Sequence, residues 1–208
     1  FASYQHSRRS KKDPVSINGL TLWDDFLRHL HFLKTEGFVD ESNTLTENGF
    51  WASKLRLDQP LLIAECIKEQ AFPADDETLF AALFAPFVYD GEQNIKITHK
   101  KISRKLTHAY SRVISILSPL SARMKKEGFP VLPLYLWTCS AVYDWARGGD
   151  WDEIIKNTGI ADGDMAMLVL RTADNLRQIT SLKDTHPEMA ALAARARETI
   201  LREPVTFE

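Results

Sequence analysis

Cysteine is scarce in this sequence, whose 208 residues contain only Cys66 and Cys139. Neither cysteine belongs to a CxxC pair, and no histidine stands beside them at the spacing of a metal site. This pattern argues against a disulfide framework and against a structural zinc site, and it suits a reducing compartment. We therefore expect a fold held together by its hydrophobic core in a cytoplasmic protein without a bound metal.

Long apolar runs and a strong net charge are also missing. No run is long enough to span a bilayer, and no signal peptide is visible. The 26 Lys and Arg residues nearly balance the 28 Asp and Glu residues, which leaves a net charge of −2. Nucleic acid could therefore be bound only through a local patch. The first residue is Phe1 rather than methionine, which suggests a fragment or a processed product.

The sequence lacks the common catalytic motifs. It contains no GxxxxGK[ST] phosphate loop and no DExH motif, so we expect it neither to bind nor to hydrolyse ATP. It also lacks GxSxG and HExxH, and its six histidines are dispersed. We predict that this chain is not an enzyme and holds no cofactor.

Helical spacing of apolar residues dominates the rest of the chain, which predicts an all-α fold. We expect a basic linker over residues 1–15, an N-terminal helical part over 16–98 and a helical bundle over 99–208. In the first helix, near residues 21–36, the apolar residues fall at helical spacing: Trp23, Phe26, Leu27, Leu30 and Leu33. The last two helices are expected at about 162–182 and 187–202.

Local signals mark several helix starts and one small β element. Thr46, Asp58 and Asp150 are predicted N-caps, and Pro60 stands where a proline suits the first helical turn. In residues 38–45, Phe38-Val39 and Thr44-Leu45 flank a polar turn, which predicts a tiny hairpin. A helix followed by such a hairpin is typical of a winged-helix-like element.

A cationic stripe is predicted on the helix near residues 100–127. Its members fall on one side of the helix: Lys101, Arg104, Lys105, His108 and Arg112. A solvated helix face explains such a stripe, and so does contact with a phosphate backbone or an acidic partner.

The long helix after Gly163 has two distinct sides. The expected packing side comprises Met165, Leu168, Thr172, Leu176 and Ile179, and the opposite ridge comprises Met167, Arg171, Asp174 and Gln178. From spacing alone, Arg171 and Asp174 form a surface ion pair. Arginine and amide side chains on one exposed ridge can also stack on bases and bind phosphate, so both interpretations stay open.

Several segments in order resemble one protein family. They are residues 33–40 (LKTEGFVD), 45–49 (LTENG), 52–56 (ASKLR), 60–67 (PLLIAECI), 145–155 (WARGGDWDEII), 158–165 (TGIADGDM) and 171–179 (RTADNLRQI). Together they resemble the C-terminal helical domain, called DSHCT, of superkiller and exosome-type DExH-box helicases. The ending at 202–205 (REPV) resembles that of bacterial members.

The resemblance implies a strand-handling accessory domain of an ATP-dependent RNA or DNA helicase. It implies that the domain packs on two RecA-like motor domains of the same polypeptide, which would hold ATP and Mg²⁺ outside this chain. It also implies that the helix after Gly163 is a ratchet helix, whose strand-contacting residues correspond to Arg171 and Asp174. Family members often carry arginine where this chain has Met167 and Leu170, which would weaken the electrostatic contact.

Two other functions are compatible with the pattern. The helix–glycine–helix order of residues 151–176 is shared by helix-turn-helix and winged-helix regulators, although the second helix is poor in base-reading side chains near its start. A helical interaction scaffold without a nucleic-acid role is the third possibility.

Overall fold

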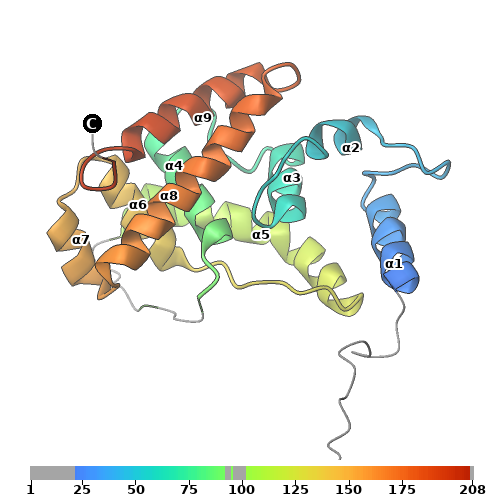
Figure 1. Ribbon diagram of the computed structural model, residues 1–208, viewed down its shortest axis with the longest axis horizontal. Helices are drawn as coiled ribbons and strands as arrows, with labels where there is room; N and C mark the ends of the chain where they lie inside the picture. The colour runs from blue at the N-terminus through green and yellow to red at the C-terminus, as the bar shows by residue number, and fades with distance from the viewer. Residues whose placement is uncertain (1–21, 92–94, 96–101, 207–208) are drawn as a thin grey trace, which may run out of the picture.

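The computed structural model describes residues 22–91, 95 and 102–206, and this part of the chain is helical (Figure 1). Its helices are α1 (Leu22–Thr35), α2 (Glu47–Ala52), α3 (Pro60–Lys68), α4 (Glu77–Val88), α5 (Arg104–Lys126), α6 (Leu136–Ala146), α7 (Trp151–Thr158), α8 (Asp162–Ile179), the 3₁₀ turn η2 (Thr180–Leu182) and α9 (Pro187–Ile200). The all-α prediction is confirmed for these residues. No described helix has the length and apolarity required to cross a bilayer.

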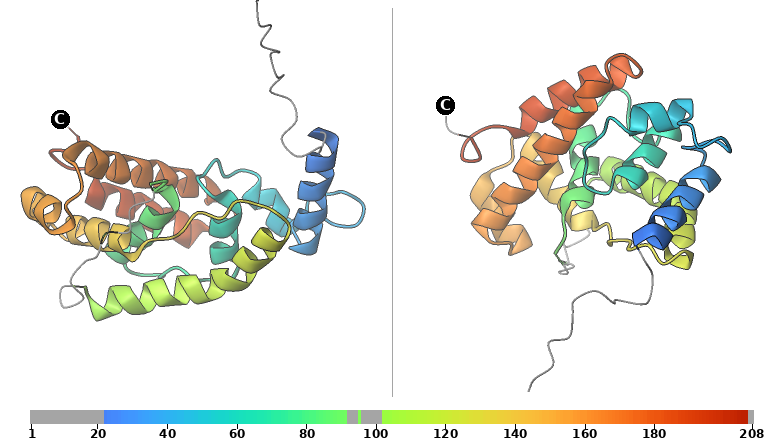
Figure 2. Two further views of the ribbon diagram at one scale, coloured as in Figure 1. Left: turned by 90° about the horizontal axis from the view of Figure 1, so that it is seen from below. Right: turned by 45° about the vertical axis from the view of Figure 1, so that its right-hand side comes forward.

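Helix α4 forms the centre of the fold. Every residue from Leu79 to Val88 is buried, as expected for a helix that is apolar on all sides. It packs against α6, α8 and α9. Figure 2 shows α8 and α9 on one side of the molecule and α5 along the other. One hydrophobic core joins these helices with α3, so residues from both predicted parts of the chain share it.

The predicted N-caps are confirmed at two of three positions. The Thr46 hydroxyl accepts from the Gly49 N–H, and the Asp150 carboxylate accepts from the Glu153 N–H. The cap assigned to Asp58 is wrong. Gln59 takes the N-cap position of α3 in a left-handed conformation, and the Asp58 carboxylate binds an arginine of α8 instead. Pro60 does stand in the first turn of α3.

The predicted winged-helix-like β element is not formed. Among the described residues, the segment 38–45 contains one isolated antiparallel bridge, between Val39 and Leu45, and no strand. The Asp40 carboxylate accepts from the N–H groups of Ser42 and Thr44 and closes the turn. Because Thr46 already caps α2, the second arm has no further residues with which to extend a ladder.

The two long amphipathic patterns have different outcomes. In α5 the side opposite the cationic stripe is apolar and is buried at Leu106, Val113, Leu117 and Leu120, and the helix continues through Pro119. In α1 most of the apolar stripe faces outwards, and only Phe32 of that helix is buried. The residues of this exposed stripe include Trp23, Phe26 and Leu27.

The predicted linker at 1–15 lies outside the described residues. The boundary near residue 98 falls within 96–101, which also lie outside them, so the division into 16–98 and 99–208 stays a prediction.

Candidate nucleic-acid interface

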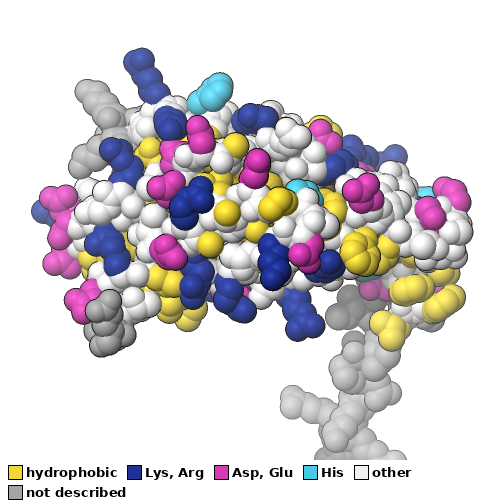
Figure 3. All heavy atoms as spheres, turned by 90° about the horizontal axis from the view of Figure 1, so that it is seen from above, with side chains coloured by type: hydrophobic (Ala, Val, Ile, Leu, Met, Phe, Trp, Pro, Cys, Tyr) yellow, Lys and Arg dark blue, Asp and Glu magenta, His cyan; other side chains and the backbone are white. Residues whose placement is uncertain are grey.

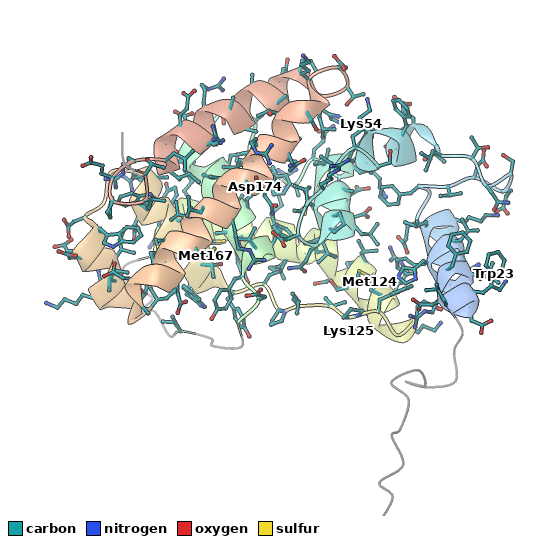
Figure 4. All side chains as sticks on the ribbon, in the orientation of Figure 1. Trp23, Lys54, Met124, Lys125, Met167 and Asp174 are labelled. Carbon is teal, nitrogen blue, oxygen red and sulfur yellow. The ribbon has the colours of Figure 1, made fainter. Side chains whose placement is uncertain are left out.

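Helix α8 has the two sides predicted from its sequence. Met165, Leu168, Thr172, Leu176 and Ile179 are all buried, where α8 packs against α4 and α9. On the other side, Met167 is 55% exposed and Asp174 is exposed, while Gln178 is half-buried. In Figure 4, Met167 and Asp174 are labelled at two positions along α8, on the side that faces the viewer.

Arg171 joins α8 to two distant segments. Its Nη2 donates to Asp58 Oδ1 at 3.0 Å, and its Nη1 donates to Asp90 Oδ2 at 3.0 Å. Asp58 precedes α3, and Asp90 follows the end of α4. Burial alone would lower the pKa of Arg171, but the hydrogen bonds to both aspartates outweigh it and raise the pKa above its ordinary value. Arg171 is therefore a charged group whose charge is compensated by two carboxylates.

The predicted surface ion pair between Arg171 and Asp174 is wrong. Asp174 instead accepts from Arg177, at 2.6 Å from Nη2 and 3.0 Å from Nε. The Arg171 side chain extends towards Asp58 and Asp90. Two carboxylates there provide two charge-assisted hydrogen bonds, whereas Asp174 on the same helix would provide one exposed ion pair. Nothing near these acids in the sequence signals the contact, since 113 and 81 residues separate them from Arg171.

A cavity of about 520 Å³ lies beside Arg171, between the end of α4 and the start of α8. Its apolar lining includes Ile160, Met167 and Leu168, and its polar lining includes Asp90 and Asp164. Two carboxylates and one compensated arginine give this cavity an acidic character. It suits a ligand with hydrogen-bond donors better than a phosphate group.

The predicted cationic stripe on α5 is only partly available for a ligand. Lys101 lies outside the described residues. Lys105 Nζ contacts Asp76 Oδ2 at 2.6 Å, and Arg112 Nη2 donates to the Gln70 carbonyl at 2.8 Å. Arg104 and His108 are exposed. Because α5 and α8 lie on opposite sides of the molecule (Figure 2), the fold does not bring this stripe and Arg171 together.

The tryptophan-rich segment before α8 connects neighbouring helices, and the Trp151 indole N–H donates to Asp162 in the first turn of α8. The Trp145 and Trp151 rings meet edge to face at 5.0 Å, and the Trp145 indole N–H donates to the Ile200 carbonyl. The Arg202 guanidinium lies 3.2 Å from the Trp145 ring centroid and donates to the carbonyls of Trp145 and Gly149. These contacts tie α6, α7 and the end of α9 together.

Gly149 is required at this joint. A Cβ atom there would come within 2.6 Å of the Asp144 carbonyl oxygen. Segment 145–155, which contributes to the family resemblance, thus has a structural role in holding α7 and α8 in place.

Two kinds of reactive site, metal-binding clusters and accessible thiols, are absent from the described residues. In residues 22–91, 95 and 102–206, no group of three His, Cys, Asp or Glu side chains is arranged to hold a metal ion. Cys66 and Cys139 are buried, and burial raises the pKa of both thiols, so neither is a ready nucleophile.

The comparisons with known proteins agree on one family. The model of the DSHCT (NUC185) domain matches residues 42–208. The chain is similar to the chloroplastic DExH-box ATP-dependent RNA helicase DExH15 of Arabidopsis thaliana, with 23% identity over 193 residues, which covers 88% of this chain and 16% of that protein. It is also similar to the antiviral helicase SKI2 of Saccharomyces cerevisiae, with 21% identity over 200 residues, covering 92% and 16%. The chain thus spans about one sixth of these relatives.

Proposed function

We propose that this chain, which belongs to the DSHCT domain family, is the accessory domain of an ATP-dependent DExH-box helicase. In this proposal the domain contacts a single strand of nucleic acid through α8 and packs on the motor domains of the same polypeptide. The observation that carries the proposal is the family match over 42–208, combined with two relatives that are both helicases.

The motor chemistry would lie outside this chain. ATP and Mg²⁺ need a phosphate-binding loop and carboxylates that hold the metal ion, and the sequence has no such loop. The cavity beside Arg171 does not fit a triphosphate, because Asp90 and Asp164 line it. The role left to this chain is to hold the strand while the motor moves it.

The exposed ridge of α8 supports the strand contact. Arg171 has five N–H donors, and the two hydrogen bonds to Asp58 and Asp90 leave others for a ligand. Met167 adds an exposed apolar surface on which a base can pack. Because two aspartates compensate the charge of Arg171, we propose that it contacts bases rather than phosphates. Asp174 and Gln178 extend the same ridge and would orient or tune the contact.

The stripe on α5 has a smaller part in this proposal. Lys105 and Arg112 already have protein partners, which leaves Arg104 and His108 as the exposed groups among its described members. The proposal therefore expects weak binding of single strands by the isolated chain, with little dependence on sequence.

Photo-crosslinking tests the strand contact directly. The full polypeptide would be irradiated with a single strand that carries a photoreactive base, and the crosslinked peptides would be mapped by mass spectrometry. Crosslinks within 162–179 are expected, and Arg171→Ala should reduce them. Arg195→Ala is the control, because Arg195 is an exposed arginine on α9, outside the ridge of α8. Crosslinks confined to the α5 side would refute the proposal.

The regulator alternative has less support. A recognition helix needs base-reading side chains at its start, whereas the first turn of α8 carries Asp162 and Asp164. The wing that would complete a winged helix is not formed in segment 38–45.

A further inference from the structure

The outer face of α1 is apolar, and no helix among residues 22–91, 95 and 102–206 covers it. We define it by Leu22, Trp23, Phe26, Leu27 and Leu30, of which Trp23 is 64% exposed and Phe26 is 52% exposed. The rings of Trp23 and Phe26 stack on each other at 5.4 Å. Figure 3 shows apolar side chains gathered at this end of the molecule, and Figure 4 shows Trp23 directed away from the other helices. Apolar side chains clustered in this way mark an interaction surface.

The opposite side of α1 is already used to attach the helix to the fold. Phe129 meets the rings of His29 and Phe32 edge to face, at 4.7 and 5.0 Å. The Arg28 guanidinium lies over the same Phe129 ring and donates to the Glu127 carbonyl. These contacts show that the inner side of α1 is packed against the fold. The exposure of the outer face is therefore not caused by a failure of the whole helix to pack. The outer face is a second apolar surface on a helix that is already anchored.

The size of the outer face limits what can cover it. A helix of 14 residues is about 21 Å long. One side of such a helix offers well under the roughly 800 Å² per partner of a stable interface between free proteins. A second copy of this chain would therefore bind too weakly through this face. A partner on the same polypeptide needs no such area, because tethering gives an effective concentration of roughly millimolar.

The comparisons place α1 at a boundary. The DSHCT match starts at residue 42, after α1 has ended. The alignment with SKI2 covers 92% of this chain and so leaves out about 17 residues. Because 21 residues precede α1, the aligned part of the chain includes α1. Helix α1 is thus shared with a helicase about six times as long but lies outside the domain that defines the family.

We infer that the outer face of α1 docks onto an apolar surface of another part of the same polypeptide. This inference rests on the proposed function, because it requires the chain to be part of a longer helicase, and it names the face that packs on the remainder. His31 and Lys34 border the apolar residues on this side of the helix. Lys34 already contacts Glu41, so the complementary surface is defined by its apolar centre rather than by charge at its edge.

Thiol labelling at Phe26→Cys measures whether the face is covered. The variant would be made in the 208-residue chain and in the full polypeptide of the same reading frame, and a maleimide would be followed at that peptide by mass spectrometry. The native Cys66 and Cys139 are fully buried and do not compete. Labelling should be about tenfold slower, or more, in the full polypeptide. Glu198→Cys on the exposed side of α9 is the control for general access.

Three results would overturn the inference. One is an equal labelling rate in both proteins. Another is a dimer of the isolated chain, seen by sedimentation and lost in Trp23→Ser, because the occupant would then be a second copy. The third is a reading frame that encodes no further domain. A second measurement guards against misfolding: Trp23→Ser with Phe26→Ser should leave the melting temperature of the isolated chain unchanged and lower that of the full polypeptide. Strand crosslinking at α8 tests the proposed function separately.

Discussion

Arg171 and Asp58 are 113 residues apart in sequence, and their side chains meet at 3.0 Å. The contact joins the middle of α8 to the residue before Gln59, the N-cap of α3, and Asp90 binds the same guanidinium from the end of α4. The candidate strand-contacting arginine is therefore supported by two acids that its own helix does not supply. This arrangement leads to specific expectations for stability and for binding.

Replacing Arg171 should affect strand handling much more than folding. The ion pairs of Arg171 are partly exposed, so Arg171→Ala should lower the free energy of unfolding by less than about 1 kcal/mol. In the full polypeptide it should reduce unwinding more than ATP hydrolysis, and Asp174→Ala should act in the same direction but less. Strand displacement, ATPase rate and thermal melting measure the three effects, with Arg195→Ala on α9 as the control. Unchanged unwinding would remove Arg171 from the site.

Removing the two aspartates should change how binding depends on salt. In Asp58→Asn with Asp90→Asn, Arg171 keeps its charge but loses its compensation, so it becomes available to a phosphate. Single-strand binding should tighten at low salt, and the slope of log K against log salt should steepen by about 0.7. Adding Arg171→Ala should abolish the gain. Fluorescence anisotropy over a salt series measures the affinity for the single strand and its slope. An unchanged slope would show that the aspartates do not compensate the charge of Arg171.

Core positions of α8 should behave in the opposite way. Leu168 and Leu176 are buried against α4 and α9, so Leu168→Ala or Leu176→Ala should cost about 2–5 kcal/mol. Leu170→Ala on the same helix is the control, because Leu170 is 41% exposed, and it should cost about 0.5 kcal/mol or less. Chemical denaturation of the three variants tests the assignment of sides. Equal losses at all three positions would contradict it.

Asp76 should make stability depend on acidic pH. Burial raises its pKa, but hydrogen bonds from Lys105, the Leu79 N–H and Thr78 outweigh burial and hold the pKa below its ordinary value. Because the folded-state pKa lies below the unfolded value of about 3.9, the carboxylate stabilises the fold above that pH and loses this effect as the pH falls through the folded value.

The matching variant is Asp76→Asn, which can still cap α4 with its side-chain oxygen. Wild type should be more stable than Asp76→Asn at pH 7, and the difference should shrink below about pH 4. Urea unfolding across this range measures the difference. A difference that stays constant down to the acid transition would mean that the charge of Asp76 contributes nothing.

Local sequence predicted most helices because their signals lie within a few residues. The N-caps at Thr46 and Asp150 need only a hydroxyl or carboxylate three residues before an N–H group, and the structure confirms both. The buried side of α8 follows from the 3.6-residue period: the five predicted residues are all buried, and Val169, Ala173 and Asn175, which were not predicted, are buried beside them. The family resemblance was likewise readable from ordered short segments, and the match over 42–208 confirms it.

Only the tertiary structure determined which partners the polar residues take and which apolar faces stay uncovered. Asp58 has the side chain of a common N-cap and stands two residues before Pro60, yet a guanidinium from α8 binds it. The ion pair between Arg171 and Asp174 was predicted from their spacing of three residues on one helix, but Asp174 binds Arg177 instead. The stripe of α1 has the spacing of a packing face, but Phe129 holds that helix from its other side. Periodicity along one helix specifies which residues share a side, whereas contacts between distant segments specify what that side meets.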